Sequence, residues 1–258
     1  MSTFLVAELG ACHDNLWPRV VSLVELCAEA GFSACKLQFW SDADRLADRR
    51  HATPAYREIY HRSQIPEHWL MLFCDLCHAH GLEAVCTVYL PEDVPIVAPW
   101  MDRLKVASFE NEDEALLDAV RQSGKPYILS VGMTDQWTYL VNAENGVRPW
   151  TLACYSAYPA PIDGGLRPLL LRNACDGYSD HTHNIWTGAV AVGLGARIIE
   201  VHVRDDDTDP ANPDYATALT PGEAQLYAEG VRTSERLIAN VPVDESAMKP
   251  FKVRAEVP

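Results

Sequence analysis

Two histidines, His181 and His202, stand where short apolar segments of this sequence give way to polar residues. The segments 178–182 and 199–203 each have the pattern of a strand end, and the apolar stretch 185–194 between them has the length of a helix. A strand–helix–strand unit of this kind makes two neighbouring parallel strands. Because parallel α/β folds keep their chemistry at the carboxyl ends of the strands, we expect the two imidazoles to lie side by side there. Two adjacent imidazoles at such an edge could bind a divalent metal ion.

The elements that would position these histidines alternate along the whole chain. Strand-like segments are expected at residues 4–8, 34–39, 84–88, 104–108, 127–130, 151–155, 177–179 and 197–203. Helical periodicity separates most of them, at residues 18–30, 66–80, 112–122, 166–173, 185–194 and 222–238. Eight strands that alternate with helices predict an α/β fold, the (β/α)8 or TIM barrel. We expect this domain over residues 1–240, a tail over 241–258, and a polar insertion at 42–63 after the second strand.

The composition argues against several classes of protein. A net charge of −15 over 258 residues argues against binding nucleic acid, which requires a basic face. No stretch approaches the roughly 20 apolar residues of a membrane span, and residues 1–16 lack the basic start of a signal peptide. The eight cysteines lie mostly inside apolar segments. We therefore expect reduced thiols and a cytoplasmic protein without a membrane partner.

Polar side chains follow every expected strand, so the barrel mouth is the expected site. The strand ends supply Glu8, Lys36, Gln38, Thr87, Tyr89, Lys105, Ser108, Glu110, Ser130, Ser156, Tyr158, Ser179, Asp180, His181, Glu200 and His202. Two lysines and four serines that converge on one mouth suit a phosphate group. Glu8 and Glu110 could act as acid–base groups. A strand end explains any one of these serines, but chance is a poor explanation for polar residues at all eight ends.

Several of these residues belong to longer motifs that occur in order along the chain. The motifs are VAELG with His13 at 6–13, KLQ at 36–38, KVAS at 105–108, GKPYILSVGM at 124–133, CYSAYPAP at 154–161, YSDHT at 178–182, EVH at 200–202 and PD at 213–214. From about residue 5 to residue 220 this series resembles the sialic acid synthase (N-acetylneuraminate synthase) family, with its related pseudaminic and legionaminic acid synthases.

The resemblance implies a reaction and a role for each matching residue. Members of that family condense phosphoenolpyruvate with an open-chain amino sugar aldehyde, release phosphate and form a 2-keto-3-deoxy sugar acid. By resemblance His181 and His202 would bind a divalent cation, with Mn²⁺ expected first and Mg²⁺, Co²⁺, Fe²⁺ and Zn²⁺ as alternatives. The expected catalytic residues are Glu8, Lys36, Glu110 and Tyr158. The expected substrate-binding residues are Gln38, Lys105, Ser108, Ser130, Ser156, Ser179 and Asp214.

The acceptor half of the expected site differs from the family pattern. Family members usually carry a C-terminal antifreeze-like domain that reaches the sugar across a dimer, whereas the sequence from residue 241 has no recognisable pattern. The resemblance implies a homodimer, with either an unusual acceptor aldehyde or an antifreeze-like domain on a separate chain. Two other functions stay open. One is a 3-deoxy-sugar-phosphate synthase or aldolase, whose phosphorylated acceptor would need Arg45, Arg49 and Arg50 as a basic cluster. The other is a barrel that binds or scaffolds without catalysis.

Overall fold

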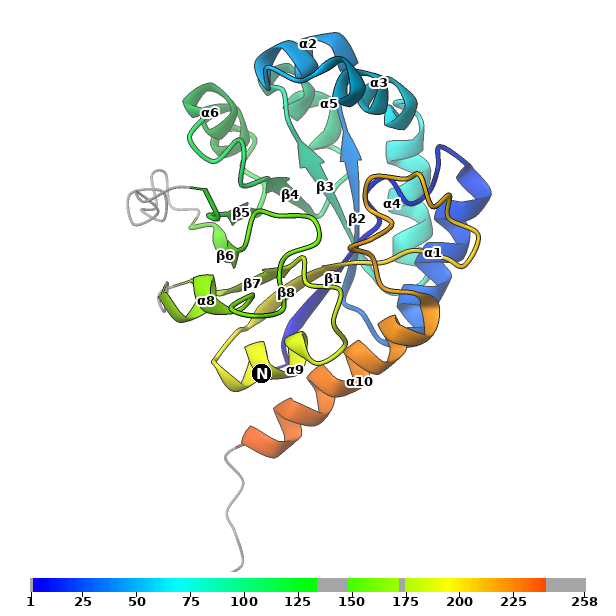
Figure 1. Ribbon diagram of the computed structural model, residues 1–258. Coiled ribbons are helices and arrows are strands. Elements are labelled where there is room, and N and C mark those ends of the chain that lie inside the picture. Colours follow the sequence, from blue (N-terminus) through cyan, green and yellow to red (C-terminus); the bar gives the residue numbers. More distant parts are fainter. Residues whose placement is uncertain (1, 134–147, 172–174, 240–258) are drawn as a thin grey trace, which may run out of the picture.

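Eight parallel strands close into a barrel in the order of the chain, as predicted (Figure 1). The computed structural model describes residues 2–133, 148–171 and 175–239, so the predicted tail 241–258 lies outside the described residues. The strands are β1 Phe4–Glu8, β2 Ala34–Phe39, β3 Glu83–Val88, β4 Arg103–Val106, β5 Tyr127–Ser130, β6 Trp150–Cys154, β7 Gly177–Asp180 and β8 Ile198–His202. The barrel closes where β1 pairs with β8, with Glu8 opposite His202. This pairing brings the first and last strand ends of the expected site together.

Six helices correspond to the predicted ones, and the described ends differ by at most three residues. They are α1 Trp17–Ala30, α4 Trp69–Ala79, α6 Glu114–Gln122, α8 Arg167–Leu171, α9 Thr187–Gly193 and α10 Pro221–Ile238. The predicted helix 166–173 ends among residues outside the described part. Side-chain caps fix two of the starts. Asp113 accepts a hydrogen bond from the Leu116 amide before α6, and Thr220 forms a capping box with Glu223 before α10.

The polar insertion at 42–63 forms two helices, which the sequence did not predict. These are α2 Ala43–Arg49 and α3 Pro54–Ser63, and Figure 1 shows them beyond the ends of β2 and β3. Both helices begin at capping residues. The Asp42 side chain accepts a hydrogen bond from the Arg45 amide, and Thr53 precedes a proline at the first helical position. A short 3₁₀ turn, η1 Pro91–Asp93, and α5 Val94–Val97 follow β3 and were also not predicted. Such short elements carry too few apolar positions for periodicity to reveal them.

The apolar core of the described residues comprises three clusters, of which one, beside the insertion helix α2, is made of Trp40, Ala43, Leu46, Tyr89 and Leu90. A small cluster fills the barrel interior, made of Val6, Ala34, Val85, Ile128, Leu152 and Ile198. A larger cluster packs the outside of the strands against the helices. The strands β7 and β8 approach closely at Gly177, where an added methyl group would overlap the carbonyl oxygen of Ile198. Most of the buried polar residues lie at or after the carboxyl ends of the strands, so this end of the barrel is polar.

Two other properties of the described chain bear on the sequence expectations. None of the described helices is both long and apolar enough to cross a membrane. None of the eight cysteines, all of which lie in the described part of the chain, forms a disulfide bond. Cys77 and Cys35 are fully buried between the strands and the helices. Reduced cysteines are commonly buried in this way, as small apolar side chains.

Candidate active site

The carboxyl ends of the strands enclose a small polar cavity, here called the inner cavity. It is lined by Glu8, Lys36, Gln38, Thr87, Tyr89, Lys105, Ala107, Ser108, Ser130, Cys154, Tyr158, Ser179, His181, Glu200 and His202. Its volume of ≈ 40 Å³ has room for about three water molecules. The walls come from all eight strands or the residues directly after them. A site built this way holds its side chains on rigid elements instead of on long loops.

Two lysines and two glutamates form a buried charge cluster in the inner cavity. Lys36 contacts Glu8 directly, and its Nζ donates to the Thr87 hydroxyl at 2.7 Å. The Nζ atoms of Lys36 and of Lys105 each lie 3.8 Å from a carboxylate oxygen of Glu200. The four charged residues are at most 4% exposed. The cluster is thus balanced in formal charge, and both lysines line the inner cavity.

Burial and the neighbouring charges have opposite effects on each pKa of this cluster, and the pKa values of Lys36 and Glu200 both end below their ordinary values. Burial lowers the pKa of Lys36 from 10.5 to about 8, against the opposing effect of Glu200. Burial raises the pKa of Glu200, but Lys105 and Lys36 outweigh that effect and hold it below its ordinary value. Glu200 also accepts a hydrogen bond from the Ser179 hydroxyl at 3.0 Å. At neutral pH the cavity therefore holds an ionised carboxylate beside a lysine that is close to its titration point.

His181 and His202 lie side by side at the cavity wall, as the strand–helix–strand pattern predicted. Their ring centroids are 5.6 Å apart, and the ring of Tyr158 lies 4.1 Å from that of His181. The Nδ1 of His181 is 2.8 Å from the carbonyl oxygen of Tyr155, which accepts a hydrogen bond from it, so Nε2 carries the lone pair and lies 3.4 Å from the Ser179 hydroxyl. Burial is the first cause that lowers both imidazole pKa values, that of His181 to about 4. Both rings are therefore neutral at pH 7, the form that binds metal ions.

The donor set fits a divalent cation that keeps most of its coordination positions open. The Nδ1 of His202 is buried and has no hydrogen-bond partner, and the nearest carboxylate oxygen, Oδ1 of Asp214, is 3.9 Å away. Within the described part of the chain no group of three or more His, Cys, Asp or Glu side chains is arranged to hold a metal ion. Two imidazoles alone leave room for water and substrate oxygens, which is a property of catalytic metal sites.

A second and larger cavity adjoins the first, here called the outer cavity. Its volume is ≈ 520 Å³, and both cavities share Gln38, Tyr89, Ala107, Ser108, Tyr158 and His202. The insertion helices and the loop between them supply much of its wall, through Arg50, His51, Ala52, Thr53, Tyr56, Ile59, Tyr60 and Ser63. A molecule in the outer cavity would therefore face the inner cavity beside His202 and Tyr158, which line both cavities.

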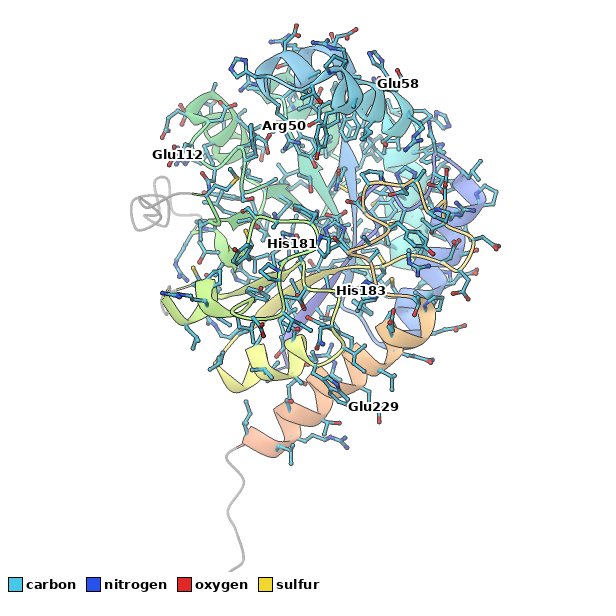
Figure 2. All side chains as sticks on the ribbon, viewed as in Figure 1. Arg50, Glu58, Glu112, His181, His183 and Glu229 are labelled. Atoms are coloured by element: carbon cyan, nitrogen blue, oxygen red, sulfur yellow. The ribbon has the colours of Figure 1, made fainter. Side chains whose placement is uncertain are left out.

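Arg50 is the only arginine or lysine among the described residues that line the outer cavity, and it is already paired. Its guanidinium donates from Nε and Nη2 to the two oxygens of Glu110 at 2.6 and 2.8 Å. The guanidinium carbon also lies 4.7 Å from the ring centroid of Tyr89 and 5.0 Å from that of Phe109. Figure 2 shows Arg50 between α2 and the barrel. A bidentate pair of this kind has a fixed geometry.

Most residues expected from the sequence line one of the two cavities. The inner cavity holds Glu8, Lys36, Gln38, Lys105, Ser108, Ser130, Tyr158, Ser179, His181 and His202. The outer cavity adds Ser156 and Asp214. Glu110 lines neither cavity, because Arg50 covers it. The catalytic and binding roles of these residues remain predictions.

Sequence reasoning gave no role to three residues that the structure places at the site. Glu200 and Thr87 stood in the expected ring of polar strand ends, and both contact Lys36. Arg50 was considered only as part of a basic cluster in the insertion. Its partner lies 60 residues away, so no local pattern could have indicated the pair.

Comparison with characterised proteins gives relatives over most of this chain. The spore coat polysaccharide biosynthesis protein SpsE of Bacillus subtilis is 28% identical over 256 residues, covering 90% of this chain and 67% of that protein. The N,N'-diacetyllegionaminic acid synthase of Legionella pneumophila is 27% identical and covers 93% of this chain and 74% of the relative. A pseudaminic acid synthase of Campylobacter jejuni is 26% identical, with coverage of 95% and 78%.

Solved structures and a family model agree with this grouping. The N-acetylneuraminic acid synthetase of Leptospira borgpetersenii superposes with a TM-score of 0.82 at 20% identity, covering 98% of this chain and 92% of that one. A truncated 3-deoxy-D-arabino-heptulosonate 7-phosphate synthase of Thermotoga maritima gives a lower TM-score of 0.63 at 15% identity. At these identities the superpositions establish the fold. The family model matches residues 23–241, and this chain belongs to the NeuB family.

Proposed function

We propose that this protein condenses phosphoenolpyruvate with an open-chain sugar aldehyde, releasing phosphate and forming a 2-keto-3-deoxy sugar acid. The observation that carries the proposal is the inner cavity, where two buried lysines and a set of hydroxyl groups meet two neutral imidazoles. Membership of the NeuB family supports the same reaction class, since relatives of this chain are named as acid synthases.

The lysines and hydroxyl groups provide the means to bind phosphoenolpyruvate. Lys36 and Lys105 can each donate charge-assisted hydrogen bonds to the phosphate or carboxylate of the substrate. The Ser130 hydroxyl is buried without a hydrogen-bond partner, and the hydroxyls of Ser108 and Ser156 lie 3.2 Å apart at the boundary of the two cavities. Such preset donors favour a group with many acceptor oxygens.

We assign Glu8 the role of accepting a proton from the attacking water. C3 of the enol bonds to the aldehyde carbon, whose oxygen takes up a proton, and water then adds to the cationic C2 before phosphate leaves by C–O cleavage. A carboxylate must accept the proton of that water. Glu8 contacts Lys36, and its Oε1 accepts from the Gly10 amide at 2.6 Å. These contacts fix the carboxylate at the mouth of β1. Its negative charge would also stabilise the positive character that develops at C2.

His181 and His202 would hold the divalent cation, with Mn²⁺ expected first because imidazole ligands disfavour Mg²⁺. When bound, the cation supplies Lewis acidity that polarises the acceptor aldehyde. The protein keeps both imidazoles neutral by burial and orients His181 through its bond to the Tyr155 carbonyl. Tyr158 packs against both rings and lines both cavities, so it can orient the acceptor between them.

The test is phosphate release from phosphoenolpyruvate in the presence of Mn²⁺, across a panel of N-acylated hexosamines and other aldoses. Release that depends on one aldose and stops on chelation would establish the reaction and identify its acceptor. The product would be verified by mass spectrometry as the sum of the two substrates with water added and phosphate removed. Failure to bind phosphoenolpyruvate at all would refute the proposal and favour a non-catalytic barrel.

A further inference from the structure

The outer cavity offers an acceptor very little free positive charge. Among the described residues that line it, Arg50 is the only lysine or arginine. Both oxygens of Glu110 bind the Arg50 guanidinium, whose Nη1 donates in addition to the Tyr60 hydroxyl at 3.2 Å. The side chains of Arg50 and Glu110 are 19% and 6% exposed. An anionic group in this cavity would have to compete with a buried bidentate partner.

The other two arginines of the basic cluster considered from the sequence also pair with acidic residues, although their side chains are more exposed than that of Arg50. Arg45 pairs with Glu92 at 2.6 Å, and Arg49 pairs with Asp113. These two pairs lie away from the cavity wall. The three arginines therefore connect α2 to the loops and helices beside β3 and β4, and do not form the basic cluster that a phosphorylated acceptor would require.

Aromatic rings take the place of charge on the cavity wall. Trp40, Tyr56, Tyr60, Tyr89, Phe109 and Tyr158 all line it. The Trp40 ring contacts those of Tyr60 and Tyr89 at 5.9 and 5.6 Å between centroids, which holds these rings in place. Tyr56 and Phe109 remain more than half exposed and available to a ligand. Such surfaces suit the C–H faces of a sugar and apolar substituents on it.

We propose that the outer cavity selects an acceptor aldehyde without a phosphate or other strongly anionic group, and that the Arg50–Glu110 pair sets this preference. The proposal rests on the proposed function, because it takes the outer cavity to be the acceptor site. Glu110 covers the guanidinium charge, while the aromatic rings contact the uncharged body of the acceptor. The phosphorylated acceptors considered from the sequence are thereby disfavoured.

The experiment measures binding in the outer cavity directly and needs no turnover. Calorimetry first records the affinity for phosphoenolpyruvate with a chelator present, which tests the inner cavity separately. The protein is then saturated with phosphoenolpyruvate, or with inorganic phosphate if that ligand does not bind. It is titrated with two matched pairs of probes: N-acetylmannosamine and its 6-phosphate, and mannose and its 6-phosphate.

Three variants make the expectation sharp. Glu110→Gln keeps the side-chain volume but frees the Arg50 charge, so we expect the 6-phosphates to bind about 10- to 100-fold more tightly than to the wild type. Tyr56→Arg adds an unpaired cation at an exposed wall position and should shift binding in the same direction without disturbing the core. Asp113→Asn is the matched control, because it frees Arg49 outside the cavity and should leave sugar-phosphate binding unchanged.

The outcomes separate clearly once thermal melting shows that each variant is folded. A gain in sugar-phosphate affinity in Glu110→Gln, with none in Asp113→Asn, supports the inference, and a gain in Tyr56→Arg shows that the cavity has room for a phosphate. A wild-type protein that binds a 6-phosphate more than about tenfold better than its unphosphorylated partner overturns it. So does the absence of any gain in the folded Glu110→Gln protein. Loss of phosphoenolpyruvate binding in the first titration would count against the proposed function alone.

Discussion

Raising the pH above neutrality should weaken phosphoenolpyruvate binding through one residue, Lys36. Its side chain is buried in the inner cavity, and burial lowers its pKa to about 8. Below that pH the ammonium form predominates and can bind an anion, whereas above it the amine is neutral. The ligand phosphate has its second pKa near about 6, so its own charge is constant over this range. Affinity should therefore fall as the pH rises through about 8.

The size of the effect follows from the protonated fraction of Lys36. If the substrate binds only the ammonium form, each pH unit above the pKa lowers that fraction about tenfold. With a pKa of about 8, the apparent dissociation constant should rise about 30-fold between neutral pH and about pH 9.5. Bound phosphate stabilises the ammonium charge, so the pKa in the complex is higher and the free protein sets the midpoint.

The assay is calorimetric titration with phosphoenolpyruvate at a series of pH values, without acceptor and with a chelator. Lys36→Arg is the control, because a guanidinium stays charged throughout the range. The arginine variant should bind more weakly at neutral pH but lose the pH dependence. A wild-type affinity that stays constant up to about pH 9.5, or an arginine variant with the same midpoint as the wild type, would refute the reasoning.

Three further substitutions test the metal site and the barrel. His181→Ala should remove both bound Mn²⁺, measured by elemental analysis, and turnover, whereas His183→Ala should keep both because His183 faces Glu223 on α10; retention of metal and turnover in the first variant would end the metal assignment. Asp176→Ala leaves the Thr151 amide and hydroxyl without their buried acceptor, at 3.0 and 3.1 Å, and should lower the unfolding free energy in urea by about 2–6 kcal/mol, at about 1–3 kcal/mol for each donor; a loss below about 1 kcal/mol would contradict this. Gly177→Ala should prevent soluble expression, since the added methyl group overlaps a carbonyl oxygen of β8; a folded protein with wild-type melting would show that the two strands can separate there.

The barrel and the histidine pair could be predicted from the sequence because both depend on local patterns. Each strand is a short apolar run, and each run ends in polar residues that must share one edge of a parallel barrel. His181 and His202 needed only one strand–helix–strand unit to be placed together, and their ring centroids are 5.6 Å apart. Helix ends were less certain, because caps such as Asp113 and Thr220 decide them by single side-chain hydrogen bonds.

The relation between Glu110 and Arg50 could not be predicted from local pattern. Glu110 stands directly after an expected strand, so it was assigned to the mouth with the other polar residues. In the structure its two oxygens bind Arg50, which comes from an insertion that periodicity did not identify as helical. A contact over 60 residues depends on how α2 packs over the barrel. Such contacts follow from tertiary packing, which a single sequence does not display.

The carboxylates of the inner cavity explain how an acidic protein can keep an anion site ready. Two buried ammonium groups without counter-charges would lose their protons, because moving each from water costs several kcal/mol. At 3.8 Å a carboxylate such as Glu200 returns about 4 kcal/mol per pair at an effective dielectric of about 20. That attraction opposes burial without cancelling it, since the pKa of Lys36 still falls to about 8. Glu200 therefore favours phosphate binding indirectly, by helping to keep Lys36 charged until the substrate arrives.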